Sequence, residues 1–415
     1  MSSKWRLSAL VIALPLFAPA LSAQHAGHDM STMIADSGMR RHLMVQAIPL
    51  VTRADPSAGG IARTEFTLTQ LFAMGRLAFW QGRASLDATL NAEGITMPDG
   101  ELNTGAHGEG FVDKRHPHTY VHELMGTARG SAGALSWSAA AGRGFAPFGT
   151  DDPMMRPFAK YPINHHLSQI LERGTLIGAA RAGPVIVEAG TFGGDEPTHP
   201  SSLPAMSRLG DSWSLRGTIL PRAGTEVQAS YARVASPEQV AGFGLDQRKS
   251  SASARMTSRS GRLYVLGEWS RTIERDHGRQ LDVFQYDSHL VEASAAPGQF
   301  TIALRLEQTE RPEEERLADA FRTPRPSSDL SINGITRWRV ATGHIDAPSV
   351  TYATVSGLPF VEIARLAASP RTPNSLVTPQ RLYGTSSFWM VTVGLRLRAG
   401  TAHSRMGRYG VALVN

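Results

Sequence analysis

The stretch Trp389-Met390-Val391-Thr392-Val393-Gly394-Leu395-Arg396-Leu397-Arg398 alternates between two kinds of side chain. Large apolar side chains stand at the odd-numbered positions, and Met, Thr, Gly, Arg and Arg stand at the even-numbered ones. Successive side chains of a β-strand point to opposite faces of its sheet, so this period of two predicts a strand with one apolar and one polar face. The stretch exceeds the roughly five or six residues of an ordinary soluble strand, but suits a tilted strand that crosses a bilayer.

The same alternation recurs elsewhere, and charged residues fall repeatedly on the polar face, as a water-filled interior would allow. Examples are Phe300, Ile302, Leu304 and Leu306 alternating with Thr301, Ala303, Arg305 and Glu307; Trp213, Leu215 and Ile219 with Ser214, Arg216 and Thr218; and Leu263, Val265 and Trp269 with Tyr264, Glu268 and Ser270. Backbone N–H and C=O groups cannot stay unpaired in lipid, so strands that cross a bilayer must close into a barrel. The sequence therefore predicts an all-β protein, a transmembrane antiparallel β-barrel.

Short turns and long loops alternate between the expected strands. Gly and Pro in the short turns supply the positive or fixed φ that tight hairpins need. The short turns are 81–83, 130–133, 181–184, 221–224, 258–261, 296–298, 344–348 and 398–400, and the long loops lie near 95–116, 148–166, 195–209, 237–247, 274–281, 311–328 and 368–384. This arrangement is typical of membrane barrels, with short turns in the periplasm and long loops outside the cell.

The pattern contains one strand candidate too many. Seventeen candidates can be counted, whereas bacterial single-chain barrels have an even number of strands. The segment Leu43–Arg53 is short and interrupted by Pro49, and Thr401–Val414 is the other doubtful candidate. We expect about 16 strands, with 14 or 18 as the alternatives.

The N-terminus divides into two segments ahead of the barrel. Residues 1–23 have a basic start, an apolar stretch and a small-residue exit, which indicates a secretory signal. Residues 24–40 are rich in His and Met without hydrophobic periodicity, so we expect a disordered arm. The barrel is then expected to span 41–415.

The composition excludes several other classes. The formal net charge of +6 over 415 residues, without a Lys/Arg-rich run, does not indicate nucleic-acid binding. The absence of cysteine excludes disulfides and thiolate metal sites. No run of 18 apolar residues follows the N-terminal segment, so we expect no helical membrane anchor.

Taken together, these features resemble the porin-like barrels of bacterial outer membranes. The segment Gly144-Phe145-Ala146-Pro147-Phe148-Gly149, which leads into a long loop, is similar to a Pro-Phe-Gly stretch of some porins. The resemblance implies an outer-membrane channel for passive passage of small hydrophilic solutes, in contact with lipid and lipopolysaccharide and assembled by the barrel insertion machinery. The chain departs from it by ending in Val414-Asn415, where such barrels present an aromatic residue to that machinery.

The third external loop is the first candidate site. In many porins the corresponding loop folds into the lumen and narrows it, and a long loop rich in Pro and aromatic residues is expected to be ordered. Opposite charges on the loop would create a transverse field that selects solutes by charge. The candidate constriction residues are Asp151, Asp152, Arg156, Lys160, His165 and His166. The alternative is an ordered loop packed over the barrel mouth.

Charged residues on the polar faces of the strands are expected to line the lumen. They are Arg216, Glu268, Arg305, Glu307, Arg396 and Arg398. Since arginines outnumber the carboxylates, this set predicts a mild preference for anions.

Two clusters offer metal donors. The arm carries His25, His28, Met30 and Met33, and resembles the His/Met-rich arms of copper-resistance envelope proteins. Imidazole suits Cu(II) and Zn, and thioether suits Cu(I). His116 and His118 could share an ion with help from another loop, whereas His122 is too distant along a regular strand.

Three functions follow from these features. The first is the channel, which requires no cofactor. The second is an envelope protein that binds Cu or Zn through its arm and uses the barrel as an anchor. The third is a barrel enzyme, although the chain has no Gly-x-Ser-x-Gly, Walker or His-Glu-x-x-His motif.

Overall fold

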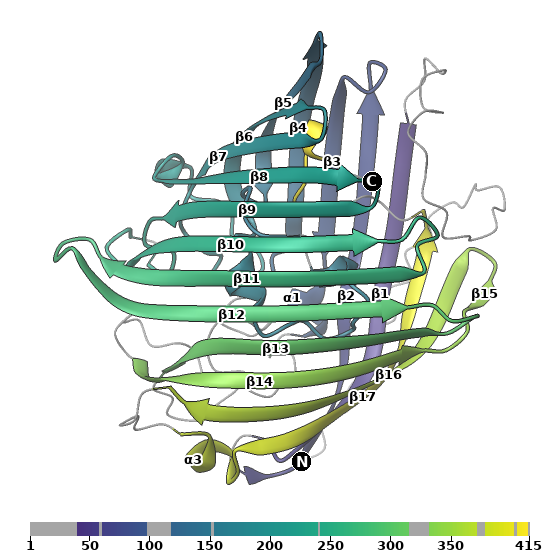
Figure 1. The fold of residues 1–415 in the computed structure, drawn as a ribbon, viewed down its shortest axis with the longest axis vertical. Coiled ribbons are helices and arrows are strands. Elements are labelled where there is room, and N and C mark those ends of the chain that lie inside the picture. Colours follow the sequence, from purple (N-terminus) through teal and green to yellow (C-terminus); the bar gives the residue numbers. More distant parts are fainter. Residues whose placement is uncertain are drawn as a thin grey trace, which may run out of the picture.

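The computed structural model describes residues 40–57, 60–97, 118–150, 153–239, 241–314, 332–371, 378–401 and 405–413. Almost all regular structure in this part is β-strand (Figure 1). The strands are β1 (Arg40–Asp55), β2 (Arg63–Phe79), β3 (Ala84–Asn91), β4 (Val121–Ala132), β5 (Leu135–Gly144), β6 (Arg173–Ala182), β7 (Val185–Phe192), β8 (Ser212–Arg222), β9 (Thr225–Val234), β10 (Asp246–Thr257), β11 (Leu263–Asp276), β12 (Leu281–Ala295), β13 (Thr301–Glu314), β14 (Ile332–Asp346), β15 (Val350–Tyr352), β16 (Val355–Pro370) and β17 (Ser387–Gly400). The short helices are α1 (Glu93–Thr96), α2 (His165–Ser168), α3 (Pro379–Tyr383) and the 3₁₀ turns η3 (Pro153–Met155), η4 (Met206–Arg208) and η5 (Gly410–Ala412).

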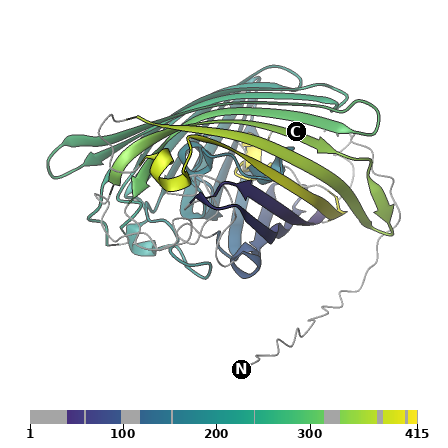
Figure 2. The same cartoon turned by 90° about the horizontal axis from the view of Figure 1, so that it is seen from below.

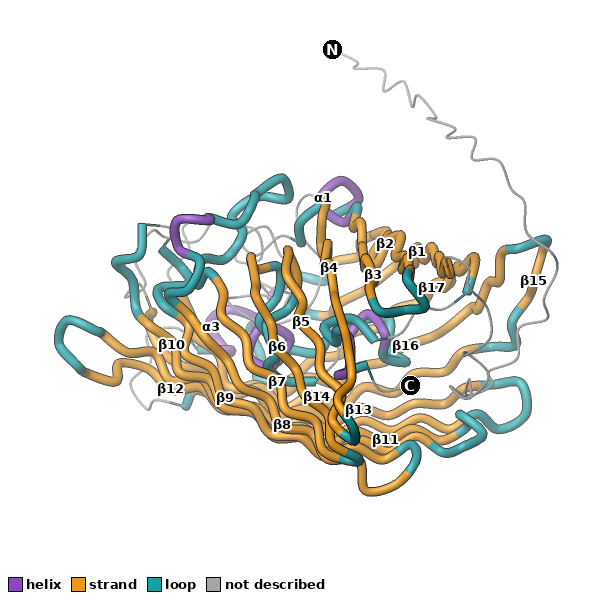
Figure 3. The backbone as a smooth tube through the Cα atoms, turned by 90° about the horizontal axis from the view of Figure 1, so that it is seen from above, coloured by secondary structure: helices purple, strands orange, loops and turns teal. Residues whose placement is uncertain are grey.

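The strands form one closed antiparallel sheet. Each long strand pairs with its neighbours in sequence, and β17 returns to pair with β1 along most of its length, from Met44 opposite Gly400 to Asp55 opposite Trp389. The three-residue β15 pairs only with the start of β16, and β14 pairs with the rest of β16. Sixteen strands therefore complete the wall, which confirms the expected barrel of about 16 strands. In Figures 2 and 3 this wall curves around loop and helix segments.

Three details of the predicted strand pattern are wrong. The last strand candidate, 401–414, does not join the sheet: its described part, 401 and 405–413, contains η5 and no strand, and the turn expected before it at 398–400 lies within β17. The predicted turn at 344–348 lies partly within β14, and the chain reverses at 353–354 instead. The predicted long loop at 274–281 is a short turn, because β11 and β12 continue to Asp276 and from Leu281. The doubtful first candidate is a full strand, β1.

The outward face of the wall is apolar. On β17, Trp389, Val391 and Val393 are 40–52% exposed, while the alternating Met390 and Thr392 are almost completely buried. Large exposed aliphatic and aromatic side chains occur in the same way on many other strands. A continuous apolar exterior on a closed barrel is the surface that hydrocarbon covers, and it accounts for the alternation seen in the sequence. No helix in the described part of the chain is long and apolar enough to cross a membrane.

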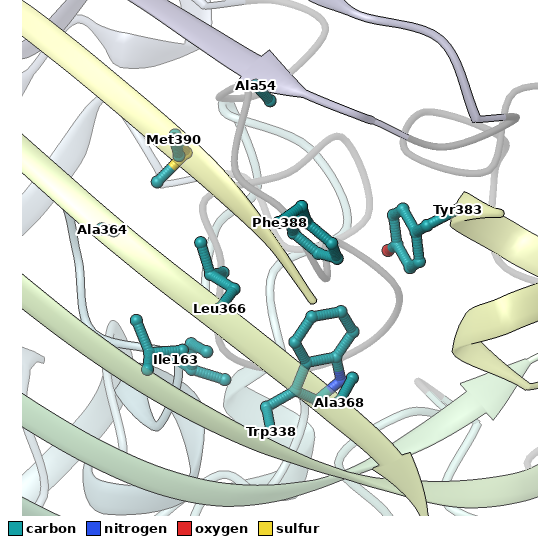
Figure 4. Packing of buried hydrophobic residues seen from close by; sticks show 10 residues of the cluster. Ala54, Ile163, Trp338, Ala364, Leu366, Ala368, Tyr383, Phe388 and Met390 are labelled. Atoms are coloured by element: carbon teal, nitrogen blue, oxygen red, sulfur yellow. The ribbon is translucent and has the colours of Figure 1, made fainter. Parts of the chain in front are cut away.

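The interior is packed rather than empty. Figure 4 shows one apolar cluster in which Ile163, from the long segment between β5 and β6, lies against Trp338 of β14 and Leu366 of β16. Tyr383 of α3 makes an edge-on contact with the Trp338 ring, with centroids 5.8 Å apart. Segments from loops thus contribute side chains to the inside of the barrel and limit its free cross-section.

Candidate functional site: the constricted lumen

The segment between β5 and β6, residues 145–172, turns into the barrel, and we call it the inner loop. The backbone N–H of Ala159 donates to Glu362 of β16 at 3.0 Å, and that of Ile163 donates to Glu307 of β13 at 2.8 Å. β13 and β16 lie far round the sheet order from β5 and β6. The inner loop therefore crosses the lumen and contacts the opposite wall.

Arginines of the far wall hold the carbonyl groups of the inner loop. Arg305 donates to the carbonyl of Lys160 at 2.9 Å, and its guanidinium lies 4.0 Å from the centre of the Phe158 ring. Arg396 donates to the carbonyl of Pro157 at 2.6 Å. A loop without helix or strand partners must satisfy its buried backbone groups in another way, and charged wall side chains do so here.

Arg156, one of the described candidate constriction residues, contacts two carboxylates of the wall. Its guanidinium lies 3.4 Å from a carboxylate oxygen of Glu268 and 3.7 Å from one of Glu292, and it donates to the Thr150 hydroxyl at 2.7 Å. Lys160 and His165 are buried in the same loop. Asp151, Asp152 and the side chain of His166 lie outside the described residues. Among the described candidate constriction residues, Arg156 thus lies against two carboxylates of the wall, and the transverse field stays a prediction.

A second segment also enters the barrel, from the end with the short turns. It comprises residues 405–413, which follow β17, and we call it the C-terminal peg. Arg408 lies 3.1 Å from Glu188 of β7 and 2.9 Å from Glu226 of β9, and Arg405 also pairs with Glu226. All of these carboxylates are almost completely buried. The C-terminal peg is therefore held against one side of the wall by ion pairs.

The C-terminal peg also contacts the inner loop. The Tyr409 hydroxyl donates to Glu123 of β4 at 2.6 Å and accepts the Phe145 N–H at 3.1 Å. Arg216 of β8 donates to the Gly149 carbonyl in the inner loop at 3.2 Å and to the Gly407 carbonyl in the C-terminal peg at 3.0 Å. One wall arginine thus joins both inserted segments.

Burial affects the titration of the C-terminal peg. Burial, followed by the nearby Arg216, lowers the pKa of Arg408 to about 10, and burial followed by the charge of Glu123 raises the pKa of Tyr409 well above its usual value. At neutral pH Arg408 therefore keeps its positive charge and Tyr409 stays neutral. Both groups hold the protonation state that their hydrogen bonds require.

An arginine-rich cavity of about 450 Å³ lies at the short-turn end of the lumen. Its lining includes Gly261 and Ala296 from the turns that precede β11 and β13. Its charged lining consists of Arg156, Arg255, Arg262, Arg396, Arg398 and Arg405 with Glu226 and Asp346. Six guanidinium groups against two carboxylates make this mouth electropositive, and it contains two of the predicted lumen residues.

Buried histidines and carboxylates form a separate cluster near the external end of β4. His118 lies 2.7 Å from Glu93 and 3.3 Å from His165, and His122 pairs with Glu172. Burial opposes the charge on Glu93, but the hydrogen bond and charge of His118, together with hydrogen bonds from the Gln70 backbone and Asn91, outweigh burial and lower the Glu93 pKa to about 2. Although burial works against its charge, His118 has a raised pKa because of Glu93. Likewise, the pKa of Glu172 is lowered, because His122 outweighs its burial.

This cluster bears on the metal hypothesis. His118 lies beside His165 of the inner loop, and the His118 and His122 rings are 5.2 Å apart between their centres. Among the residues that the structure describes, however, no three His, Cys, Asp or Glu side chains are placed to hold an ion. His116 and the arm residues His25, His28, Met30 and Met33 lie outside the described residues.

Several charged lumen residues were missed by the sequence analysis. Glu188, Glu292, Glu362 and His344 all occupy the polar positions of their strands, so strand parity could have found them. His344 lies 2.9 Å from Glu362 and 3.0 Å from Asp346. Arg408 carried no usable signal because its segment was interpreted as a strand.

Comparison with known proteins identifies the fold. No family model matches the sequence, and no curated protein matches it. Among solved structures, the anion-selective porin from Comamonas acidovorans is 13% identical with a TM-score of 0.52, covering 88% of this chain and all of that one. The outer membrane channel DcaP of Acinetobacter baumannii is 10% identical with a TM-score of 0.51, covering 91% of this chain and all of that one. A loop-deletion mutant of OmpT, an outer membrane protein of Vibrio cholerae, is 10% identical with a TM-score of 0.51, covering 88% and 100%.

These likenesses define the class by architecture. The chain has the 16-stranded barrel fold of porins and other outer-membrane proteins. At such low sequence identity these likenesses establish the fold alone.

Proposed function

We propose that this protein is a porin-like channel of a bacterial outer membrane that passes small hydrophilic solutes and prefers anions. The observation that carries the proposal is the arginine-lined cavity at the short-turn mouth of a closed, lipid-facing barrel. A mouth with an excess of fixed positive charge raises the local concentration of anions and repels cations. The printed names of similar folds, a porin and a channel, agree with passage rather than catalysis.

The inserted segments suggest a narrow channel. Arg156 of the inner loop and Arg408 of the C-terminal peg are buried in ion pairs with wall carboxylates, so these charges are neutralised inside the barrel. At the mouth, Arg255 and Arg398 are partly exposed, so their charges act on solute there. We therefore expect the arginines of the mouth, Arg405 of the C-terminal peg among them, to favour anions and the inserted segments to set the size limit.

Planar-bilayer recording tests the proposal. The refolded protein should give stable single-channel steps, and its reversal potential in a salt gradient should indicate anion preference. Arg255→Gln combined with Arg398→Gln should reduce that preference, because two guanidinium charges leave the mouth. Arg259→Gln is the matched control, since Arg259 is exposed in the adjacent turn and does not line the cavity. A folded barrel without conductance would contradict the proposal.

We also propose the surroundings that this function implies. The apolar exterior would contact outer-membrane lipid and lipopolysaccharide, and insertion machinery would assemble the barrel. The chain would reach this membrane through the N-terminal secretory signal expected at 1–23.

The His/Met-rich arm supports a second candidate, capture of Cu or Zn at the cell envelope. Imidazole and thioether donors lie within a few residues of one another at 25–33. Deleting residues 24–33 should lower Cu(II) binding and copper tolerance under this hypothesis, while conductance should not change. Unaltered copper binding in the deletion variant would exclude the arm as the site.

A further inference from the structure

The C-terminal peg changes the charge of the wall on which it lies. Glu188 and Glu226 are two buried carboxylates on β7 and β9, and each pairs with Arg408. Arg405 gives Glu226 a further close partner and at the same time lines the arginine-rich cavity. With the C-terminal peg in place, the positive charges of Arg405 and Arg408 therefore lie against the carboxylates of Glu188 and Glu226.

Withdrawal of the C-terminal peg would remove these two positive charges. Arg216 would still pair with Glu188, at 2.7 Å from both of its oxygens, whereas Glu226 would lose the close contacts with Arg405 and Arg408 and keep the more distant Arg255, at 3.9 Å. Glu123 would lose the hydroxyl of Tyr409. The uncovered wall would then present carboxylates to the lumen, while the cavity would lose the guanidinium group of Arg405.

The C-terminal peg also occupies space that water and solute would otherwise fill. Met406, Tyr409 and Ala412 are at most 3% exposed. The η5 turn lies against β4, β5, β6 and β7, and the Val411 N–H donates to Ser138 of β5 at 3.1 Å. Its removal would therefore widen the passage along this side of the barrel.

The attachment of the C-terminal peg permits such a movement. It makes no strand pairing with the wall, and it is fixed by side-chain ion pairs, a few hydrogen bonds and apolar contacts. Gly407 and Gly410 have positive φ values of 77° and 56°, so the segment follows an irregular path rather than an extended one. Its release would leave every hydrogen bond of the closed sheet intact.

We propose that the C-terminal peg is a built-in selectivity determinant, which narrows the channel and, by adding the positive charges of Arg405 and Arg408 beside Glu188 and Glu226, makes it prefer anions. Its displacement produces a wider, less anion-preferring or cation-preferring path. The proposal rests on the proposed channel function and adds the residues that set its width and sign.

The test is Arg408→Glu in the full-length protein, recorded in planar bilayers. The substitution places a third carboxylate beside Glu188 and Glu226, so like-charge repulsion should expel the C-terminal peg. We expect the single-channel conductance to rise at least about twofold, because conductance grows with the open cross-section, and the reversal potential to move toward cation preference. Arg259→Glu, an equal change of charge at an exposed position in a turn of the same mouth, should leave the conductance at the wild-type value.

A second pair of variants covers a failure to fold. Deletion of 401–415 should give the same wide state, and Tyr409→Phe, which removes two hydrogen bonds and keeps the ring, should give more frequent openings to it. Heat-modifiable mobility on a gel verifies the barrel in each case. Folded variants with wild-type conductance and reversal potential would overturn the proposal. The wild-type protein could lack anion preference while the variants still show a higher conductance. That result would contradict the proposed anion selectivity but would support the C-terminal peg as the element that narrows the channel.

Discussion

Arg216 and Glu188 face each other on the inner side of neighbouring strands and form a two-pronged ion pair, with both N–O distances at 2.7 Å. Both side chains are about 1% exposed. The same guanidinium also donates to the carbonyls of Gly149 and Gly407, so this pair anchors the inner loop and the C-terminal peg together. The wall, the inner loop and the C-terminal peg therefore meet at this ion pair.

Arg216→Ala should destabilise the protein strongly. Removing one partner of a buried ion pair leaves an uncompensated charge and typically costs about 3–5 kcal/mol. Denaturant unfolding of the reconstituted protein should show this loss. Arg222→Ala, at an exposed position on the same strand, should change the stability by less than about 0.5 kcal/mol. Similar losses in the two variants would mean that the pair has no special role.

The Glu93–His118 pair predicts how stability depends on pH. The Glu93 pKa is lowered from 4.5 to about 2, so its contribution is complete above about pH 4.5 and is lost as the pH falls toward 2. The His118 pKa is raised above 6.5, so its contribution is complete below that pH and is lost as the pH rises through the folded-state value. Thermal unfolding should therefore show greatest stability between about pH 4.5 and 6.5.

The variant His118→Gln isolates this effect. It should weaken the alkaline decline, since the imidazolium of residue 118 is gone, and weaken the acid limb because Glu93 loses a charged partner. His289→Gln, at an exposed outward position of β12, is the control. An unchanged alkaline limb in His118→Gln would assign the decline to another group.

Glu362→Ala should loosen the inner loop. Glu362 accepts the Ala159 N–H and pairs with His344, so its removal leaves two buried groups to find other partners. We expect larger current fluctuations at constant voltage, because the loop is less firmly held to the far wall. Ile363→Ala, on the outward face of the same strand, should leave the noise unchanged. Wild-type current fluctuations in Glu362→Ala would show that the other contacts are enough to hold the inner loop against the far wall.

The apolar exterior gives a depth-dependent prediction. Leu306→Arg on β13 should destabilise the barrel in lipid by roughly 2–4 kcal/mol, the cost of a cation near the middle of the bilayer. Phe300→Arg, one residue before the same strand, should cost about 0–1 kcal/mol because it lies near the interface. Unfolding from vesicles measures both, and equal costs would contradict a membrane position centred near Leu306.

The sheet could be predicted because its signal is local. In β17, side chains from Trp389 to Arg398 alternate in the sequence as they do in space, since one face meets lipid and the other meets the lumen. The strand count was also constrained by the even-number rule. The strand predicted at 401–414 was wrong for a reason that local sequence does not contain. Because β1 already pairs with β17, the closed sheet offers no edge to a further strand. Gly407 and Gly410 were visible in the sequence, but their conformation depends on the wall that they contact.

The lumen was less predictable for the same reason. The length and composition of the inner loop indicated order, and strand parity placed Arg305 and Arg396 inside. Their actual partners, the carbonyls of Lys160 and Pro157, are separated from them by well over a hundred positions. No local pattern encodes such pairings, so the clamping of the loop by wall side chains became evident only in the structure.

The C-terminal peg has a consequence for the order of biogenesis. It is tethered to β17, the last strand, yet its binding groups lie on β4 to β9 and on the inner loop, which are all made much earlier. These groups face one another only after the wall has formed. Docking of the C-terminal peg can therefore only follow closure of the wall, and under the proposed function we expect the barrel to be wider before that step.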